Sequence, residues 1–221
     1  MLRLCPPSCQ NRRRRTQHEQ TRKTNPLLDQ AGLPLFSKIK PEHVEPAIDH
    51  LLAENRRRIE ELLDNAGQPS WENLVEPIEE WEDHLERVWS PVSHMNAVTN
   101  SEELRAAYNA CLPKLSDYGT EMGHNERLFH AYKAVAEHAK DLDDGQRKVL
   151  DNALRDFHLS GVDLAPDKKQ RFKEISQELS SLTSKYSENV LDASNAWSKR
   201  IDDANALAGL PQSALDLAKH T

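Results

Sequence analysis

The sequence has little of what catalytic motifs require. Its seven glycines are dispersed along 221 residues, so no glycine-rich loop is available to hold a phosphate group. There is no G-x-S-x-G segment, and no serine or cysteine stands in a recognisable nucleophile context. The helical zinc-peptidase motif H-E-x-x-H is also absent. Taken by itself, the chain shows no catalytic chemistry.

Cysteines and long apolar runs are also scarce. Cys5 and Cys9 are spaced C-x3-C, which differs from the usual C-x2-C zinc spacing, and Cys111 stands alone. An odd, sparse set of cysteines suits a reducing cytoplasm, which we predict as the location. No apolar run approaches the ~18 residues of a membrane span. No apolar core of ~7–15 residues follows the N-terminal charges, so we expect neither a membrane partner nor a secretory signal.

The composition is lean for a self-contained globular domain. Hydrophobic residues make up 37% of the chain, charged residues 29%, and the mean hydropathy is -0.78. Globular domains are typically about 45–50% apolar, glycine included. This balance indicates either a set of long solvated helices or one part of a larger assembly.

The net charge of -7 argues against a general nucleic-acid binder, which needs a clustered positive field. The basic residues Arg12 to Arg15, Arg22 and Lys23 lie in a segment without apolar periodicity. We predict that residues 1–23 are a disordered or artefactual leader and that nucleic acid is not a partner. A nucleic-acid or targeting role for Arg12 to Arg15 is the alternative.

From Thr24 onward, apolar residues recur at steps of three and four, and no stretch alternates as a strand would. This pattern predicts an all-α fold of long amphipathic helices. The first helix is expected to open at Pro41 and to end before Gly67. The second is expected from Trp71, with a heptad-like seam that Pro91 should kink or interrupt. The two apolar stripes are Val44, Ile48, Leu51, Leu52, Ile59 and Leu62, then Leu74, Ile78, Trp81, Leu85, Val88, Val92 and Met95.

The later helices follow from the same pattern. Asn100 to Glu103 resembles a capping box for a third helix, whose apolar face is Leu104, Tyr108, Cys111 and Leu115. Further helices are expected over Glu126–Lys140 and Gln146–Leu159, the second stopped by Gly161. A long helix is expected from Pro166 to Arg200, about 50 Å in length. For its aromatic residues Phe172, Tyr186 and Trp197, core packing is favoured over a role in a ligand groove.

A last helix is expected to begin at Pro211 and has no sequence signal for its end. We interpret this as a truncation.

A glutamate follows a histidine within two residues at four places, and none has metal-site spacing. His18–Glu19 has Arg22 where a second histidine would be needed. The other three pairs are two residues apart, which places their side chains on different faces of a helix: His43 and Glu45, His84 and Glu86, His124 and Glu126. We predict that His43 is a surface or capping residue, and that the chain holds no catalytic, cofactor-binding or metal-binding residue.

Three segments resemble a known family: SPVSHMNAV (90–98), LRDFHLSGV (154–162) and SENVLDA (187–193). Together with the surrounding sequence from Thr24 to Thr221, they resemble the N-terminal part of oligopeptidase A-like members of the thimet oligopeptidase family of zinc metallopeptidases. The resemblance implies a two-lobed, largely helical enzyme with a deep channel that admits only short peptides. It also implies that the H-E-x-x-H zinc helix and the third zinc ligand, a glutamate, lie in the second half of a longer chain.

On this resemblance, residues 24–221 are the N-terminal helical region of such an enzyme, truncated before the catalytic domain. They form one wall of the channel, limit substrate size and bind no zinc. We expect the chain to be inactive alone, with short peptides as substrates of the whole enzyme and a missing catalytic C-terminal part as a partner. The alternative is a non-catalytic helical interaction module, which could pair with a separately encoded catalytic half.

Overall fold

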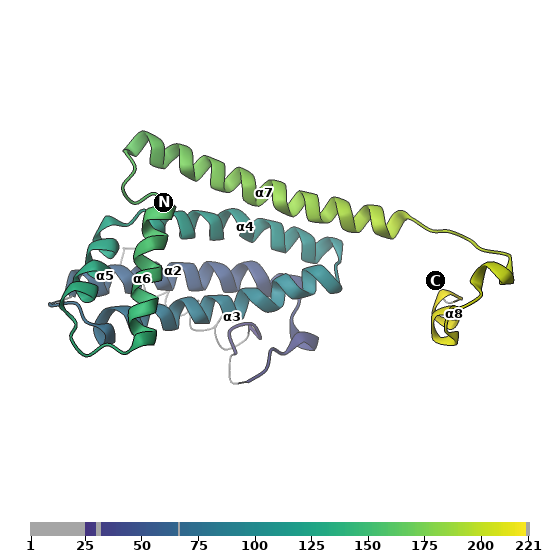
Figure 1. Cartoon of the computed structure of the whole chain (residues 1–221), viewed down its shortest axis with the longest axis horizontal. Helices are drawn as coiled ribbons and strands as arrows, with labels where there is room; N and C mark the ends of the chain where they lie inside the picture. Colours follow the sequence, from purple (N-terminus) through teal and green to yellow (C-terminus); the bar gives the residue numbers. More distant parts are fainter. Residues whose placement is uncertain (1–24, 30–31, 66, 220–221) are drawn as a thin grey trace, which may run out of the picture. The chain divides into compact units, whose positions relative to one another are not determined.

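The computed structural model describes residues 25–29, 32–65 and 67–219. Within these ranges the chain forms helices joined by short connections and contains no strand, which confirms the all-α prediction (Figure 1). The elements are η1 (Phe36–Lys38), α2 (Pro41–Asn65), η2 (Trp71–Val75), α3 (Glu76–Val98), α4 (Glu102–Gly123), α5 (Glu126–His138), α6 (Asp144–Ser160), α7 (Pro166–Ala196), η3 (Ala204–Leu207) and α8 (Gln212–Ala218).

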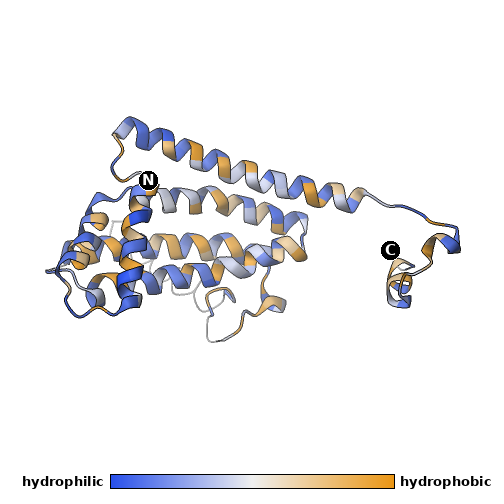
Figure 2. Cartoon of the chain, in the orientation of Figure 1, coloured by the Kyte–Doolittle hydropathy of each residue, from blue (hydrophilic) through white to orange (hydrophobic). Residues whose placement is uncertain are grey.

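The chain divides into two compact units, residues 1–182 and 183–221. In the first unit, α2, α3 and α4 lie side by side and α6 runs across them (Figure 1). Short connections make consecutive helices antiparallel neighbours, and the apolar stripes predicted from the sequence face one another between them. The same stripes recur along each helix when residues are coloured by hydropathy (Figure 2). Their buried members form a first core: Val44, Ala47, Ile48, Leu51, Leu52, Leu85, Val88, Val92, Leu104, Cys111 and Tyr118, with Leu27, Leu28 and Ile39 from the preceding segment.

A second core lies where α5 and α6 pack against η2 and the later turns of α2. Aromatic rings dominate it: Phe129 and Phe157 meet edge to face at 5.7 Å, and Tyr132 meets Phe157 at 5.6 Å. Its buried members are Ile59, Leu74, Val75, Ile78, Leu128, Phe129, Tyr132, Val135, Leu150, Phe157 and Val162. The two cores together position the first unit's helices.

Two local predictions are corrected by the structure. The helix that Pro91 was expected to kink or interrupt is not interrupted, because α3 continues through this position, and the proline is buried. Burial of the ring offsets the missing N–H, and the carbonyl left without a donor belongs to exposed Arg87. The cap of α4 is Ser101, whose side chain accepts a hydrogen bond from the Leu104 N–H, rather than Asn100. The Asn100 amide instead donates to the carbonyl of Asn96 at 2.9 Å.

The ends of α3 and α6 agree with their sequence signals. Ser70 and Asn73 form a reciprocal capping box ahead of η2, a single wide turn that leads into α3. Gly161 ends α6 with φ of 91°, a left-handed conformation that favours glycine. The N–H of buried Val162 then donates back to the Phe157 carbonyl at 3.0 Å, as in a Schellman turn.

The prediction that the aromatic residues of the long helix pack in a core is wrong for two of the three. Phe172 is half-buried against His124, with ring centroids 5.4 Å apart. Tyr186 and Trp197 are 71% and 73% exposed, and Trp197 follows the end of α7 at Ala196. No residue of α7 is buried, although it is the longest helix described. Exposed apolar residues along α7 and the second unit are Ile175, Leu179, Leu182, Tyr186, Val190, Trp197, Ile201, Leu210 and Leu217.

Candidate functional site

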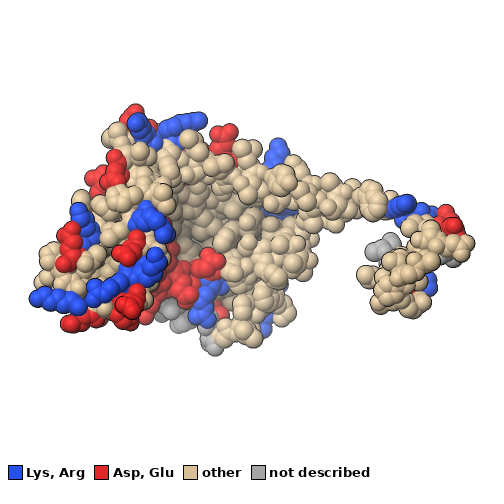
Figure 3. All heavy atoms as spheres, in the orientation of Figure 1, with Lys and Arg blue, Asp and Glu red and all other residues tan. Residues whose placement is uncertain are grey.

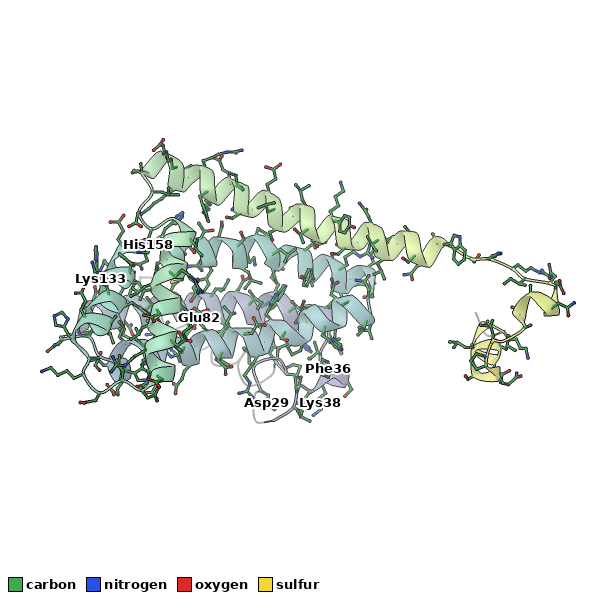
Figure 4. The ribbon with its side chains drawn as sticks, viewed as in Figure 1. Asp29, Phe36, Lys38, Glu82, Lys133 and His158 are labelled. Carbon is green, nitrogen blue, oxygen red and sulfur yellow. The ribbon has the colours of Figure 1, made fainter. Side chains whose placement is uncertain are left out.

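Three titratable groups whose pKa values are raised by burial, Glu82, Tyr118 and Tyr132, lie on α3, α4 and α5. The Tyr118 hydroxyl donates to the Glu82 carboxylate at 2.6 Å, joining α4 to α3. Nearby, buried Asn55 donates from its amide to the Trp81 carbonyl at 3.3 Å, and the Arg56 guanidinium lies 5.3 Å from the centre of the Tyr118 ring. Figure 4 labels Glu82 near the middle of the first unit. Perturbed groups of this kind are where acid–base chemistry is first sought.

Burial is the main cause of each shift in this cluster. It raises the pKa of Glu82, and repulsion by Glu79 acts in the same direction, against the hydrogen bond from Tyr118. Burial and the neighbouring carboxylate raise the pKa of Tyr118, so its hydroxyl stays protonated and remains a donor. Burial, with the charges of Glu79 and Glu82, also raises the pKa of Tyr132. The arrangement is a hydrogen-bonded acid and phenol that links α3 and α4.

Removing the Tyr118 hydroxyl tests how much its hydrogen bond to Glu82 contributes to the free energy of unfolding. Tyr118→Phe should lower the free energy of unfolding by about 1–2 kcal/mol at neutral pH, because a partly buried carboxylate then loses its donor. Urea denaturation followed by circular dichroism measures the change. The matched control is Tyr186→Phe on exposed α7, which should change the stability by less than about 0.5 kcal/mol. Equal effects of the two substitutions would contradict the assignment.

The raised pKa of Glu82 predicts a definite pH dependence. The folded state holds the Glu82 proton more tightly than the unfolded state does, so this group's contribution to stability is lost as pH rises from 4.5 through the raised pKa. Glu82→Gln remains neutral and can still accept from Tyr118. Its stability should therefore exceed that of the original chain at neutral pH, and the difference should shrink below pH 4.5.

Thermal melts across this pH range measure that difference. Glu80→Gln, at an exposed position two residues away, is the control. Parallel stability curves for Glu82→Gln and the original chain would refute the prediction.

In two of the histidine–glutamate pairs of the sequence, the histidine and the glutamate have separate partners. His43 accepts a hydrogen bond from the Lys40 N–H through Nδ1 at 3.0 Å, while Glu45 pairs with Lys114 at 2.7 Å. The capping role predicted for His43 is therefore confirmed. The Nε2 atom of His124 lies 2.9 Å from the Ser160 carbonyl, while Glu126 pairs with Lys169 at 2.7 Å.

Glu86 of the remaining pair lines a cavity, and His84 is not among the lining residues. His18 and Glu19, with Cys5, Cys9 and the basic residues before Thr24, lie outside the described residues. Across the described ranges, no group of three or more His, Cys, Asp or Glu side chains is placed to hold a metal ion.

A cavity of about 320 Å³ lies between α3 and the segment that precedes α2. Asp29 lines it, and Figure 4 shows Asp29 with Phe36 and Lys38 in that segment. The side chain of Phe36 contacts His94 of α3 edge to face at 6.0 Å. The cavity wall is mostly apolar, and its charged members are Asp29 in the segment before α2 and the adjacent Glu86 and Arg87 on α3. The other residues of the wall are Pro26, Leu27, Gly32, Leu33, Pro34, Ile39, Ser90 and Pro91.

Several charged side chains on the surface pair across helices. Lys114 of α4 lies between two acids of α2, 2.7 Å from Glu45 and 2.6 Å from Asp49. Arg127 of α5 likewise lies between Glu60 and Asp64, at 2.9 and 2.7 Å. On the face drawn in Figure 3, basic and acidic residues intermingle over α5 and α6. These pairs fix helices on one another and present no single-sign surface on that face.

Among the described helices, none combines the length and apolar character needed to cross a membrane. The first unit is thus an all-α bundle without a recognisable catalytic constellation. The functional class is therefore inferred from the similarity of the sequence to known proteins.

The sequence model of the Neurolysin/Thimet oligopeptidase N-terminal domain matches residues 48–169. Oligopeptidase A of Salmonella typhimurium (strain LT2) is 50% identical over 198 residues, 89% of this chain and 29% of that protein. Oligopeptidase A of Haemophilus influenzae is 48% identical over 202 residues, 90% of this chain and 29% of that protein. A probable cytosolic oligopeptidase A of Arabidopsis thaliana is 37% identical over 201 residues, 90% of this chain and 28% of that protein.

The chain belongs to the thimet oligopeptidase family, in which it matches the N-terminal domain, and the resemblance read from the sequence is confirmed. It spans less than a third of the length of these relatives.

Sequence reasoning missed the link between Glu82 and Tyr118. Tyr118 continues the three- and four-residue steps of Leu104, Cys111 and Leu115, so its burial could have been predicted. Glu82 follows Trp81 in a run of acids and carries no local signal. Only the packing of α3 against α4 brings the two residues together, from positions 36 residues apart.

Proposed function

We propose that this chain is the N-terminal helical part of an oligopeptidase A-like zinc metalloendopeptidase that hydrolyses short peptides. The observation that supports the proposal is its identity of 48–50% over about nine tenths of its length to two proteins named oligopeptidase A. The cysteine pattern and the Arabidopsis relative named as cytosolic favour a cytoplasmic location.

The residues of this chain do not fit a zinc site. The sequence has no H-E-x-x-H motif, and the described residues hold no cluster of three metal-ligating side chains. We therefore assign the zinc-dependent step to polypeptide outside this sequence and propose a supporting role for residues 24–221. That role is to form a wall of the substrate channel and to limit the size of the peptides that enter. The cross-helix ion pairs and two apolar cores suit a rigid wall.

A fusion protein provides the test. This chain is joined ahead of the part of Salmonella oligopeptidase A that follows its matched region, and hydrolysis of a short peptide is measured with and without a zinc chelator. We expect the chain alone to be inactive and the fusion protein to be active, chelator-sensitive and selective for short peptides over an unfolded protein. Activity of the chain alone, or a folded but inactive fusion protein, would overturn the proposal.

A non-catalytic interaction module is the second candidate. The observation that favours it is the exposed apolar side of α7, because large exposed apolar surfaces mark binding sites. A genuine module should melt cooperatively by itself, as circular dichroism would show. It should also bind a protein partner without gaining peptidase activity in the fusion protein.

A further inference from the structure

The long helix α7 turns its polar side toward the helix bundle. Lys169 pairs with Glu126 at 2.7 Å, Lys173 pairs with Asp117 at 3.2 Å, and Gln177 donates to the same Asp117. The ring of Phe172 is the aromatic contact on this side, against His124. A helix that packs on its own domain normally does so through its apolar stripe. Here, apart from Phe172, the side chains that contact the bundle are polar.

The apolar stripe of α7 lies on a different side of the helix. Ile175 is two residues from both Lys173 and Gln177, which is roughly 200° around an α-helix. Leu182, Tyr186 and Val190 continue the stripe at steps of seven, four and four. These residues are 41% (Ile175), 55% (Leu182), 71% (Tyr186) and 49% (Val190) exposed. We call Ile175, Leu182, Tyr186 and Val190 the outer stripe.

The extent of the family similarity indicates what covers the outer stripe. The N-terminal domain model ends at residue 169, before the stripe begins. Similarity to oligopeptidase A nevertheless covers about nine tenths of the chain, and those proteins are more than three times as long as the matched region. The stripe therefore lies beyond the residues that the domain model matches, and the relatives contain further polypeptide outside the region that corresponds to this chain.

We infer that the outer stripe is the docking surface for the polypeptide that follows the region matched by this chain in oligopeptidase A, and that an apolar face of that polypeptide covers it. The inference rests on the proposed function, since it identifies the same catalytic part as the occupant. It also accounts for two observations together: the polar contacts of α7 with its own bundle, and the absence of any buried residue in this helix. Alanine and serine are small replacements that leave helix formation possible, so the stripe can be tested by substitution.

The first test uses the chain alone. The double variant Leu182→Ser with Tyr186→Ser should melt within about 2 °C of the original chain, because side chains that are 55% and 71% exposed add little to its stability. The matched control, Ser181→Ala with Lys185→Ser, changes exposed polar positions of the same helix. A fall of more than about 5 °C for the stripe variant alone would show that the stripe packs within this chain, and would overturn the inference.

The second test uses the fusion protein described above and measures hydrogen exchange of the backbone amides over residues 175–190. We expect exchange to be about 100-fold slower in the fusion protein than in the chain alone, because docking protects the helix. The stripe variant should lose this protection and the control variant should keep it. Unchanged exchange in an active fusion protein would overturn the docking surface and leave the proposed function standing. Protection of these amides in a fusion protein without peptidase activity would support the docking surface and overturn the proposed function.

Sedimentation velocity on the chain alone tests for another occupant. The chain should be monomeric at micromolar concentration. A dimer that dissociates in the stripe variant and persists in the control would assign the outer stripe to a second copy of this chain and overturn the inference.

Discussion

Replacing Ile48 with alanine should lower the free energy of unfolding by about 2–5 kcal/mol. Ile48 is completely buried in the first core, on the stripe that α2 presents to α3 and α4. The substitution removes buried methyl and methylene groups and leaves a cavity that rigid neighbouring helices fill only in part. A loss of this size is a large fraction of the roughly 5–15 kcal/mol that stabilises an ordinary domain.

Chemical denaturation followed by far-ultraviolet circular dichroism measures the loss. The matched control is Leu159→Ala in α6, where the leucine is 70% exposed and the same kind of truncation should cost less than about 0.5 kcal/mol. If both variants lost the same stability, Ile48 would not be the core residue described above.

Adding a single methyl group at Gly123 should also destabilise the chain, by about 1–3 kcal/mol. Gly123 is the last residue of α4, and it lies against the last residue of α6. A Cβ atom at this position would be 2.6 Å from the Ser160 Cβ and 2.9 Å from its Oγ. The Ser160 Cβ cannot rotate away, because it is fixed to the backbone, so the two helix ends must move apart. The better helix propensity of alanine offsets less than about 1 kcal/mol of this cost.

A double-mutant cycle isolates the contact. Ser160→Gly removes the group that the new methyl would meet, so Gly123→Ala should cost much less in the Ser160→Gly background than in the original chain. Unfolding free energies of the two single variants and the double variant give the coupling, which we expect to exceed about 1 kcal/mol. Additive effects would show that the helix ends are not in contact as described.

Periodicity predicted the helices well because each presents an apolar stripe to a neighbour in the same chain. The stripe from Val44 to Ile59 is buried as predicted, and Gly161 ends α6 through the left-handed conformation that its sequence position indicated. Boundaries were less secure where two capping residues adjoin, since Asn100 and Ser101 can both cap and only the local hydrogen bonds decide between them. At Pro91 the local signal was strong, but tertiary packing prevailed: burial of the proline outweighs its preference against a helix.

The sequence could not show how α7 is used. Its spacing predicts an amphipathic helix, but periodicity does not identify which surface the apolar side meets. The expectation that Tyr186 packs in a core fails because its side chain is 71% exposed. In the part of α7 that belongs to the first unit, polar residues such as Lys173 and Gln177 contact the bundle. The link between Glu82 and Tyr118 was missed for a related reason, since it depends on the alignment of two helices distant in sequence.

The position of Cys111 allows the opening of the helix bundle to be measured by the rate at which its thiol is alkylated. Its thiol is completely buried in the first core, and burial raises its pKa to about 11, so the reactive thiolate is scarce in the folded chain. Alkylation at this residue must therefore wait for α4 to separate from α2. Mass spectrometry of the peptide that contains Cys111, after timed exposure to iodoacetamide, would report how often the bundle opens under native conditions. Docking that steadies the bundle would lengthen that labelling time.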